Sequence, residues 1–326
     1  FRRSRGLGDV YKRQIDKCRT AMGRRTLKQW ILRPLAQKEA IEERQDAVAS
    51  IARSSRRLDD LRGCLKGLRD MERLATQLSY NRSGGRDLVA IGLALERMPR
   101  LKAICSEVDD LLLNKLSNDL DVLETMRIDI QANLNDEQPL SMRDGGIIRE
   151  GIDKKLDDLR DAAAVGHKWF KDLEIRERAR LEIPSLKVRH NRQIGWYIEV
   201  TKTHLGKVPE DWNRRQQMTN GNRYVTDELV EWEDKLVTAA TKANTIEYNM
   251  FRDLRDRCRE KSRTLGMISS CVAQIDTLQC FAEIARNRSW TRPVIHDDSR
   301  LIAKGLRHPV LEVQNGFVPN DVKLDK

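Results

Sequence analysis

Residues 186–202 read LKVRHNRQIGWYIEVTK, and this stretch determines how the chain around it can fold. Hydrophobic side chains occupy every second position from Ile194 to Val200, with Gly195, Tyr197 and Glu199 between them. Such alternation is typical of a β-strand with one buried face. The triplet NRQ at 191–193 provides a turn back to Leu186–His190, so the stretch predicts β-structure.

Long helical patterns lie on both sides of this β-structure. After the turn RDGGIIREG (143–151), apolar or small residues recur at heptad spacing up to Pro184: Ile152, Leu156, Leu159, Ala163, Gly166, Phe170 and Leu173. Beyond it, a second stripe comprises Leu229, Trp232, Leu236, Ala240, Ala243, Met250 and Leu254. The 44 residues from Asn222 to Leu265 contain no Gly or Pro, enough for a helix of up to ~66 Å. The sequence therefore predicts a β insertion at the end of two long antiparallel helices.

The insertion is strongly basic. Within 185–226, eight Lys or Arg face three acids, a local net charge of +5. Basic side chains mixed with Asn, Gln and Thr suit phosphate contacts better than base reading. The candidate DNA-binding residues are Lys187, Arg189, Arg192, Lys202, Arg214, Arg215, Asn220, Asn222 and Arg223. From composition alone, a merely soluble surface hairpin is as good an interpretation of this stretch as a phosphate-binding surface.

The rest of the chain is mostly helical in pattern. From Ile15 to about residue 140, helical segments are interrupted near Pro34, Gly84-Gly85, Pro99 and Pro139, which predicts helices over 37–53, 56–80, 86–98 and 100–134. Charged residues make up 34% and aromatic residues 5% of the 326 positions, and the net charge is +11. This composition favours long, charge-covered helices, and we expect a polyanionic partner.

The same inventory argues against several classes of site. No apolar stretch is long enough to span a membrane, and no secretory signal is visible. The six cysteines are far apart and the histidines scattered, so we expect no metal site and a reduced cytoplasmic setting. His190 and His204 could approach each other, but no Cys, Asp or Glu nearby completes a ligand set.

Both ends of the chain differ from its middle. Residues 1–14, FRRSRGLGDVYKRQ, carry five basic residues without apolar periodicity, and we expect a non-native or disordered leader. Residues 292–326 contain short β-like runs, Leu301–Ala303 and Val310–Val313, broken by Gly and Pro. A new domain is expected to begin there.

Four blocks, in order, resemble the MutS family of DNA mismatch repair proteins. IDKCRTAMGRRTLKQWILRPL (15–35) is similar to the opening of that family's core domain, and DGGIIREGIDKKLDDLR (144–160) to the turn before its first lever helix. LKVRHNRQIGWYIEV with RRQQMTNGNRYVTDELVEWEDKL resembles the clamp and its return into the second lever. GLRHPVLE with GFVPNDV (305–312, 316–322) resembles the first strands of the ATPase domain.

The resemblance implies a mainly α fold, in which a helical core and two antiparallel lever helices carry a small β clamp, followed by the first β segments of a truncated α/β ATPase domain. The implied domains are helical core and ascending lever (15–184), clamp (185–226), descending lever and connecting helix (227–289) and ATPase start (290–326). It also implies double-stranded DNA, mismatched DNA included, a MutS-type dimer partner, a MutL-type protein and a bacterial, nucleoid-associated cytoplasmic location.

By the same resemblance, Phe317, Pro319 and Asn320 contact bound nucleotide, with ATP and Mg²⁺ as cofactors of the parent protein. No GxxxxGK[ST] phosphate loop occurs in the sequence, so no cofactor and no catalytic residue is expected in this segment itself.

Two other interpretations remain open. One is a MutS-like paralogue or truncation that clamps DNA without catalysis. The other is an ordinary coiled-coil scaffold with a β insertion, against which the basic tip argues.

Overall fold

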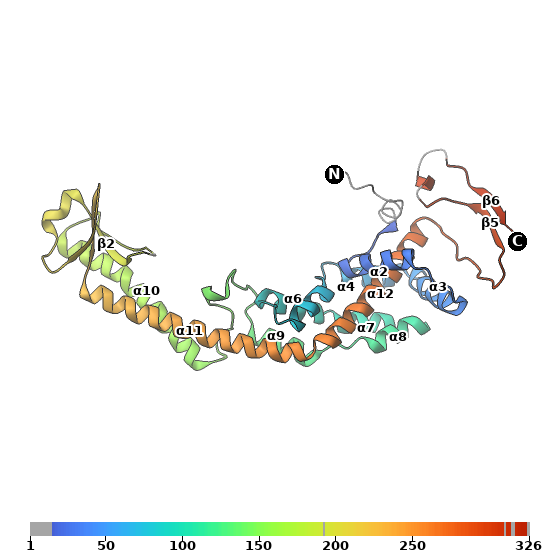
Figure 1. Cartoon of the computed structure of the whole chain (residues 1–326), viewed down its shortest axis with the longest axis horizontal. Helices are drawn as coiled ribbons and strands as arrows, with labels where there is room; N and C mark the ends of the chain where they lie inside the picture. Colours follow the sequence, from blue (N-terminus) through green and yellow to red (C-terminus); the bar gives the residue numbers. More distant parts are fainter. Residues whose placement is uncertain (1–14, 192, 310, 314–316, 325–326) are drawn as a thin grey trace. The chain divides into compact units, whose positions relative to one another are not determined.

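The computed structural model describes residues 15–191, 193–309, 311–313 and 317–324, so the expected leader 1–14 lies outside the described residues. The fold is mainly α, as predicted, with small antiparallel sheets (Figure 1). The chain divides into two compact units, one formed by residues up to Ala132 together with those from Leu254 onward, the other by Asn133–Asp253. This division is coarser than the predicted domain boundaries, which stay predictions.

The first unit is a helical assembly around one apolar helix, α12 (Ser262–Asn287). Its other helices are α2 (Ala21–Leu32), α3 (Lys38–Ala52), α4 (Ser55–Leu65), α5 (Met71–Ser79), α6 (Gly85–Leu95), α7 (Met98–Ser106) and α8 (Leu111–Asp119), and α9 (Glu124–Asn133) ends at the boundary between the units. Helix α12 packs against α2, α3, α4, α5 and α8. A helix covered on so many sides must be apolar nearly all round, and fourteen residues of α12 are buried.

Two predicted helices in this unit prove to be interrupted. The segment 56–80 breaks between α4 and α5, where Gly67 has φ of 76° and Asp70 caps α5 by accepting a hydrogen bond from the Arg73 N–H. The segment 100–134 divides into α7, α8 and α9, and Asp110 caps α8 in the same way. Buried apolar residues continue on both sides of each break, so periodicity alone does not reveal the breaks.

The second unit contains α10 (Lys154–Leu181) and most of α11 (Asp227–Glu260), two long antiparallel helices, and the part of α11 from Leu254 onward belongs to the first unit. Along their contact, residue numbers rise on α10 and fall on α11. The pairs are Arg160 with Glu247, Trp169 with Trp232 and Arg176 with Glu228. The predicted helical stretch up to Leu265 is not continuous, since α11 ends at Glu260 and α12 begins at Ser262. The turn before α10 contains η1 (Met142–Asp144).

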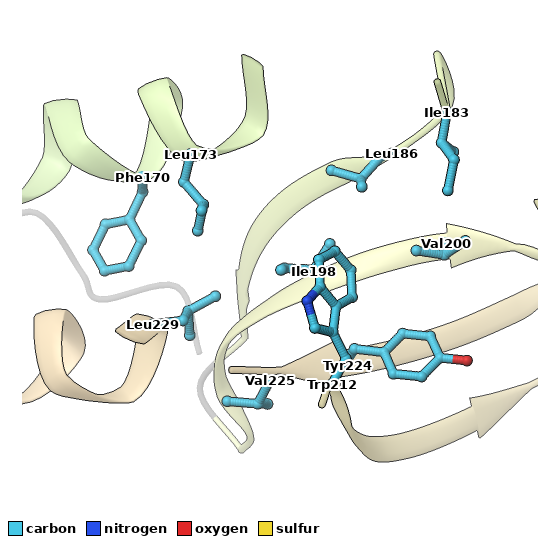
Figure 2. Packing of buried hydrophobic residues seen from close by; sticks show 10 residues of the cluster. All are labelled: Phe170, Leu173, Ile183, Leu186, Ile198, Val200, Trp212, Tyr224, Val225 and Leu229. Carbon is cyan, nitrogen blue, oxygen red and sulfur yellow. The ribbon is translucent and has the colours of Figure 1, made fainter. Parts of the chain in front are cut away.

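Between α10 and α11 the chain forms a four-stranded antiparallel sheet of order β1-β2-β4-β3. Its strands are β1 (Lys187–Asn191), β2 (Gly195–Thr201), β3 (Asn213–Met218) and β4 (Gly221–Val225), with η2 (Lys202–Lys207) after β2. Figure 2 shows the apolar side chains that join one sheet face to the helices: Phe170, Leu173, Ile183, Leu186, Ile198, Val200, Trp212, Tyr224, Val225 and Leu229. The predicted β insertion between two helices is thus confirmed.

The C-terminal segment forms a separate antiparallel pair, β5 (Leu301–Leu306) with β6 (Asn320–Leu324). The predicted β-like run at Val310–Val313 is wrong in its described part, because Leu311–Val313 forms the 3-10 turn η3 instead. The Leu311 N–H donates to His308 Nδ1 at 3.2 Å, a local bond that favours a turn over an extended strand. Among the described residues, no helix is long and apolar enough to cross a membrane.

Candidate nucleic-acid interface

The sheet has one apolar face and one basic face. Strand alternation directs Ile198 and Val200 into the core, so Tyr197 and Glu199 lie on the opposite face. Directly opposed residues share a face, which places Arg189 beside Tyr197 and Lys187 beside Glu199. Both cations are exposed. This basic face is therefore available to a polyanion.

Arg223 lies in the middle of that face but is engaged within the protein. Its guanidinium carbon lies 4.4 Å from the Tyr197 ring centroid, and its Nε lies 3.8 Å from Glu199 Oε2. Its Nη1 donates to Gln216 Oε1 at 2.8 Å. Because Glu199 offsets part of its charge, Arg223 contributes less to the surface potential than Lys187 or Arg189.

Strand β3 is an edge strand, like β1, and carries two further exposed cations, Arg214 and Arg215. All six of its side chains are exposed. The register shifts between Arg214 and Gln216, a bulge that leaves Arg215 without a cross-strand partner. Within the described part of the chain, neither Arg214 nor Arg215 forms an ion pair. Both guanidinium groups are thus free to bind phosphate.

The remaining predicted DNA contacts differ in exposure. Lys202 at the start of η2 and Asn220 in the β3–β4 turn are exposed, and the Lys202 N–H donates to the Asn220 carbonyl at 3.1 Å. Asn222 is only 6% exposed, and its Nδ2 donates to Tyr224 Oη at 3.1 Å, so its side chain offers no surface to DNA in this conformation. Arg192 lies outside the described residues.

Aromatic stacking joins the sheet to α10 and joins α10 to α11. The ring of Phe170 on α10 stacks on Trp196 of β2, with centroids 4.0 Å apart and planes 3° from parallel. Trp169 and Trp232 stack between α10 and α11 at 5.1 Å. Where α11 begins, a hydrogen bond from Arg176 to Glu228 at 2.7 Å raises the pKa of the Arg176 guanidinium. These contacts give the basic face a fixed orientation on the helices.

Two carboxylates that the sequence reasoning missed bind the sheet's backbone. Glu174 Oε2 on α10 accepts the Val188 N–H at 2.7 Å, and Glu233 Oε1 on α11 accepts the Trp196 N–H at 3.2 Å. A Cβ on Gly195 would lie 2.3 Å from Glu233 Oε1, and its φ is 74°. Each acid follows an apolar stripe residue, Leu173 or Trp232, and that adjacency was the available sequence signal.

The predicted nucleotide-binding residues are adjacent at the start of β6. Phe317 is half-buried, whereas Pro319 and Asn320 are exposed, and Asn320 Nδ2 donates to the Val318 carbonyl at 3.1 Å. Their nucleotide contact stays a prediction, and the sequence contains no phosphate loop to complete a nucleotide site. No group of three potential metal ligands occurs among the residues described.

The fold and this site define a helical protein that presents a basic β-sheet on two long antiparallel helices. The family model for MutS domain III matches residues 13–282. The chain is 36% identical over 314 residues to the DNA mismatch repair protein MutS of Caldicellulosiruptor saccharolyticus, covering 95% of this chain and 36% of that protein. It is 37% identical over 329 residues to that of Methanosarcina barkeri, covering 99% of this chain and 37% of that protein.

The MutS protein of Salinibacter ruber gives a similar result, with 38% identity over 315 residues that cover 95% of this chain and 35% of that protein. The chain therefore belongs to the MutS family, which confirms the resemblance found in the sequence. It spans about a third of the length of the curated relatives it matches.

Proposed function

We propose that the four-stranded sheet binds the backbone of duplex DNA without reading its sequence, as the clamp of a mismatch repair protein. The observation that carries the proposal is the exposed β3 edge, where Arg214 and Arg215 have no ion pair among the described residues. Lys187 and Arg189 on the basic face and Lys202 nearby add three exposed cations. Such contacts suit a protein that must hold any sequence.

In this proposal, α10 and α11 act as levers that connect the sheet to the rest of the protein. Support comes from the stacked pairs and the carboxylates that fix the sheet to both helices. A sheet fixed in this way transmits a displacement of either helix to the DNA contact. The alternative, a MutS-like protein that clamps DNA without catalysis, uses the same sheet and differs in having no nucleotide hydrolysis.

For the whole protein, the proposal includes ATP with Mg²⁺, whose adenine would lie near Phe317, Pro319 and Asn320. It also includes duplex DNA that encloses a mismatch, a MutS-type dimer partner and a MutL-type protein. The names of the relatives support the repair role, since each is called a DNA mismatch repair protein.

The test is the salt dependence of DNA binding by this chain. Neutralising about five phosphates predicts a slope of log affinity against log salt of roughly −4 to −5. Duplexes of unrelated sequence should give the same affinity and slope, which fluorescence anisotropy with labelled duplexes measures. No binding at moderate salt, or a strong preference for one sequence, would contradict the proposal.

A further inference from the structure

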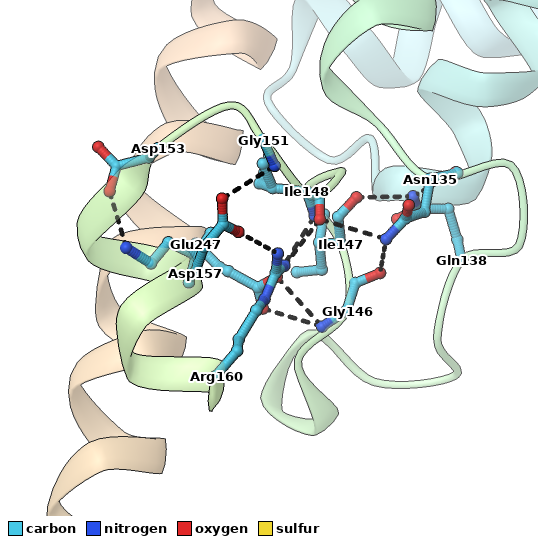
Figure 3. A network of polar contacts seen from close by, with 11 residues as sticks. Asn135, Gln138, Gly146, Ile147, Ile148, Gly151, Asp153, Asp157, Arg160 and Glu247 are labelled. Atoms are coloured by element: carbon cyan, nitrogen blue, oxygen red, sulfur yellow. Dashed lines mark hydrogen bonds and ion pairs between the residues drawn. The ribbon is translucent and has the colours of Figure 1, made fainter. Parts of the chain in front are cut away.

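A buried carboxylate occupies the joint where α10 begins. Glu247 lies on α11 and is 2% exposed. Its carboxylate accepts the Gly146 N–H at 2.9 and 3.2 Å and the Ile148 N–H at 3.4 Å, and it also contacts the Arg160 guanidinium (Figure 3). The backbone donors come from a turn about a hundred residues earlier in the chain.

The turn is shaped to receive an anion. Gly145 and Gly146 have φ of 71° and 79°, in the left-handed region that favours glycine. This turn directs the N–H groups of Gly146 and Ile148 toward one carboxylate, and backbone N–H groups gathered in a turn favour negative charge. A Cβ on Gly145 would lie 2.9 Å from Asn244 Oδ1 and 3.3 Å from Glu247 Oε2. Glycine at this position therefore permits both the conformation and the close approach of α11.

The opposite side of the turn is bound just as firmly. Asn135 Nδ2 donates to the Gly146 carbonyl at 2.8 Å and to the Ile148 carbonyl at 3.2 Å. Gln138 Nε2 donates to the Ile147 carbonyl at 3.0 Å. With its carbonyls bound to side chains from residues 133–138, the turn keeps its N–H groups directed toward Glu247 (Figure 3).

Arg160 extends this network into the first turns of α10. Its Nη2 donates to the Ile148 carbonyl at 2.7 Å, and its Nη1 lies 3.4 Å from Asp157 Oδ1. Asp157 Oδ2 accepts the Gly151 N–H at 2.9 Å. A continuous set of hydrogen bonds therefore runs from Glu247 on α11 through the turn to the beginning of α10.

We infer that Glu247 is a positioning residue: a built-in anion in the 145–148 turn that fixes where α10 starts on α11. The inference about the joint rests on geometry alone. Its consequence for DNA binding rests on the proposed function, because the basic sheet is attached to both helices and its orientation depends on how they are held together.

Hydrogen exchange separates this role from an ordinary ion pair. In Glu247→Ala, the amides of Gly146 and Ile148 should exchange at least about tenfold faster, while those of β2 and β4 keep their wild-type rates. Added acetate should restore protection by occupying the vacated site, whereas chloride at equal ionic strength should not. Unchanged exchange in Glu247→Ala would overturn the inference.

A charge swap provides the decisive contrast. The double variant Arg160→Glu/Glu247→Arg restores an ion pair but leaves the two N–H groups without an acceptor, since arginine only donates. It should therefore exchange as fast as Glu247→Ala, and restored protection would overturn the role of the N–H groups. Glu247→Gln keeps an acceptor oxygen and the side-chain shape, so its exchange rates at Gly146 and Ile148 should exceed those of wild type and stay below those of Glu247→Ala. This variant serves as the test if the alanine variant folds poorly.

DNA binding gives the functional readout. If loosening the joint leaves about a fifth of the molecules with the sheet correctly held, affinity falls about fivefold with an unchanged salt slope, because the phosphate contacts are the same. Faster exchange with unaltered affinity would overturn the link to DNA. A wild-type chain that binds no DNA would instead refute the proposed function and leave the exchange result standing.

Discussion

Helices α11 and α12 follow each other in the chain, yet they are stabilised differently. Fourteen of the 26 residues of α12 are buried, against seven of the 34 residues of α11, which lie along one stripe. Each helix nevertheless carries one acid that is almost fully buried, Asp276 in α12 and Glu247 in α11.

Both acids accept backbone N–H groups from distant segments. Asp276 accepts the N–H groups of Arg19 at 2.9 Å and Thr20 at 2.7 Å, and the Thr20 hydroxyl at 2.7 Å. It thereby holds the start of α2 against the mostly buried helix α12, whereas Glu247 holds a turn on α11, most of whose residues are not buried. The same chemistry should therefore give a global effect in one unit and a local effect in the other.

The largest effect is expected at Asp276. Replacing it with Ala removes the acceptor of four donors, the Arg19 and Thr20 N–H groups, the Thr20 hydroxyl and the Gln279 amide, and should cost about 3–5 kcal/mol of stability in the first unit. Urea denaturation followed by circular dichroism measures this change. The exposed Asp161→Ala is the matched control and should lie within about 0.5 kcal/mol of wild type. Equal effects of the two variants would contradict the comparison.

A smaller, localised loss is expected at the sheet. Phe170 is 1% exposed and stacks on Trp196, so Phe170→Ala should destabilise the second unit by about 3 kcal/mol. Tryptophan fluorescence, to which Trp169, Trp196 and Trp232 contribute, should then change at lower urea than the helical signal of the first unit. A single transition shifted as a whole would show that the two units do not unfold separately.

Backbone crowding predicts a further loss in the same sheet. A Cβ on Gly221 would lie 2.3 Å from the Val200 carbonyl oxygen and 3.0 Å from Thr201 Cα, so Gly221→Ala must separate β4 from β2 at a cost of about 2 kcal/mol. Gly206 has open space around its Cβ position, and Gly206→Ala is the control. Thermal denaturation should distinguish the two, and equal melting temperatures would contradict this account.

The smallest effect at neutral pH concerns the cysteine thiols, five of which are buried and all six of which lie in the first unit. Burial raises the pKa of Cys105 to about 12 and that of Cys258 to about 12, from an ordinary 9.0. The pKa of each of these two thiols is higher in the folded than in the unfolded state. The stability that the protonated thiols contribute is therefore complete below pH 9.0 and is lost as the pH rises toward 12. The expected loss is about 1.4 kcal/mol per pH unit and thiol.

Comparing Cys105→Ala with wild type tests this dependence. Its unfolding free energy should fall less steeply above pH 9 than that of wild type, whereas the stability of the second unit, which contains no cysteine, should show no such contribution. Parallel curves for the two proteins would contradict the prediction.

Much of the fold was predictable because it rests on local periodicity. The change from heptad to alternating spacing located the sheet between α10 and α11, and the quoted blocks identified the family. The seam prediction was partly right, since Leu156, Gly166, Phe170 and Leu173 are buried while Ile152 is exposed. Apolar spacing gives a helix face but not the first residue of the helix, and Ile152 precedes Asp153, the residue that caps α10.

The polar interactions were not predictable from one sequence. Glu247 and Asp276 bind groups 101 and 256 residues away, and although Asp276 is the only charged residue between Thr264 and Ala282, its neighbours in the sequence do not show which groups it binds. The polar Asn222 lies within a basic stretch, which predicts a DNA contact, but strand alternation directs its side chain inward toward Tyr224. The strand register decides whether such a residue faces the core or the solvent, and the register depends on the turns and on the bulge in β3.

The central claim is that the basic sheet holds the DNA backbone, and the salt slope of the Arg214→Ala/Arg215→Ala variant tests it most directly. Loss of two phosphate contacts should reduce the magnitude of the slope by about two from its wild-type value. Lys28→Ala/Arg33→Ala, which removes two exposed cations from the region of α2, should leave the slope unchanged. An unaltered slope in the Arg214/Arg215 variant, or an equal reduction in the control, would contradict the account.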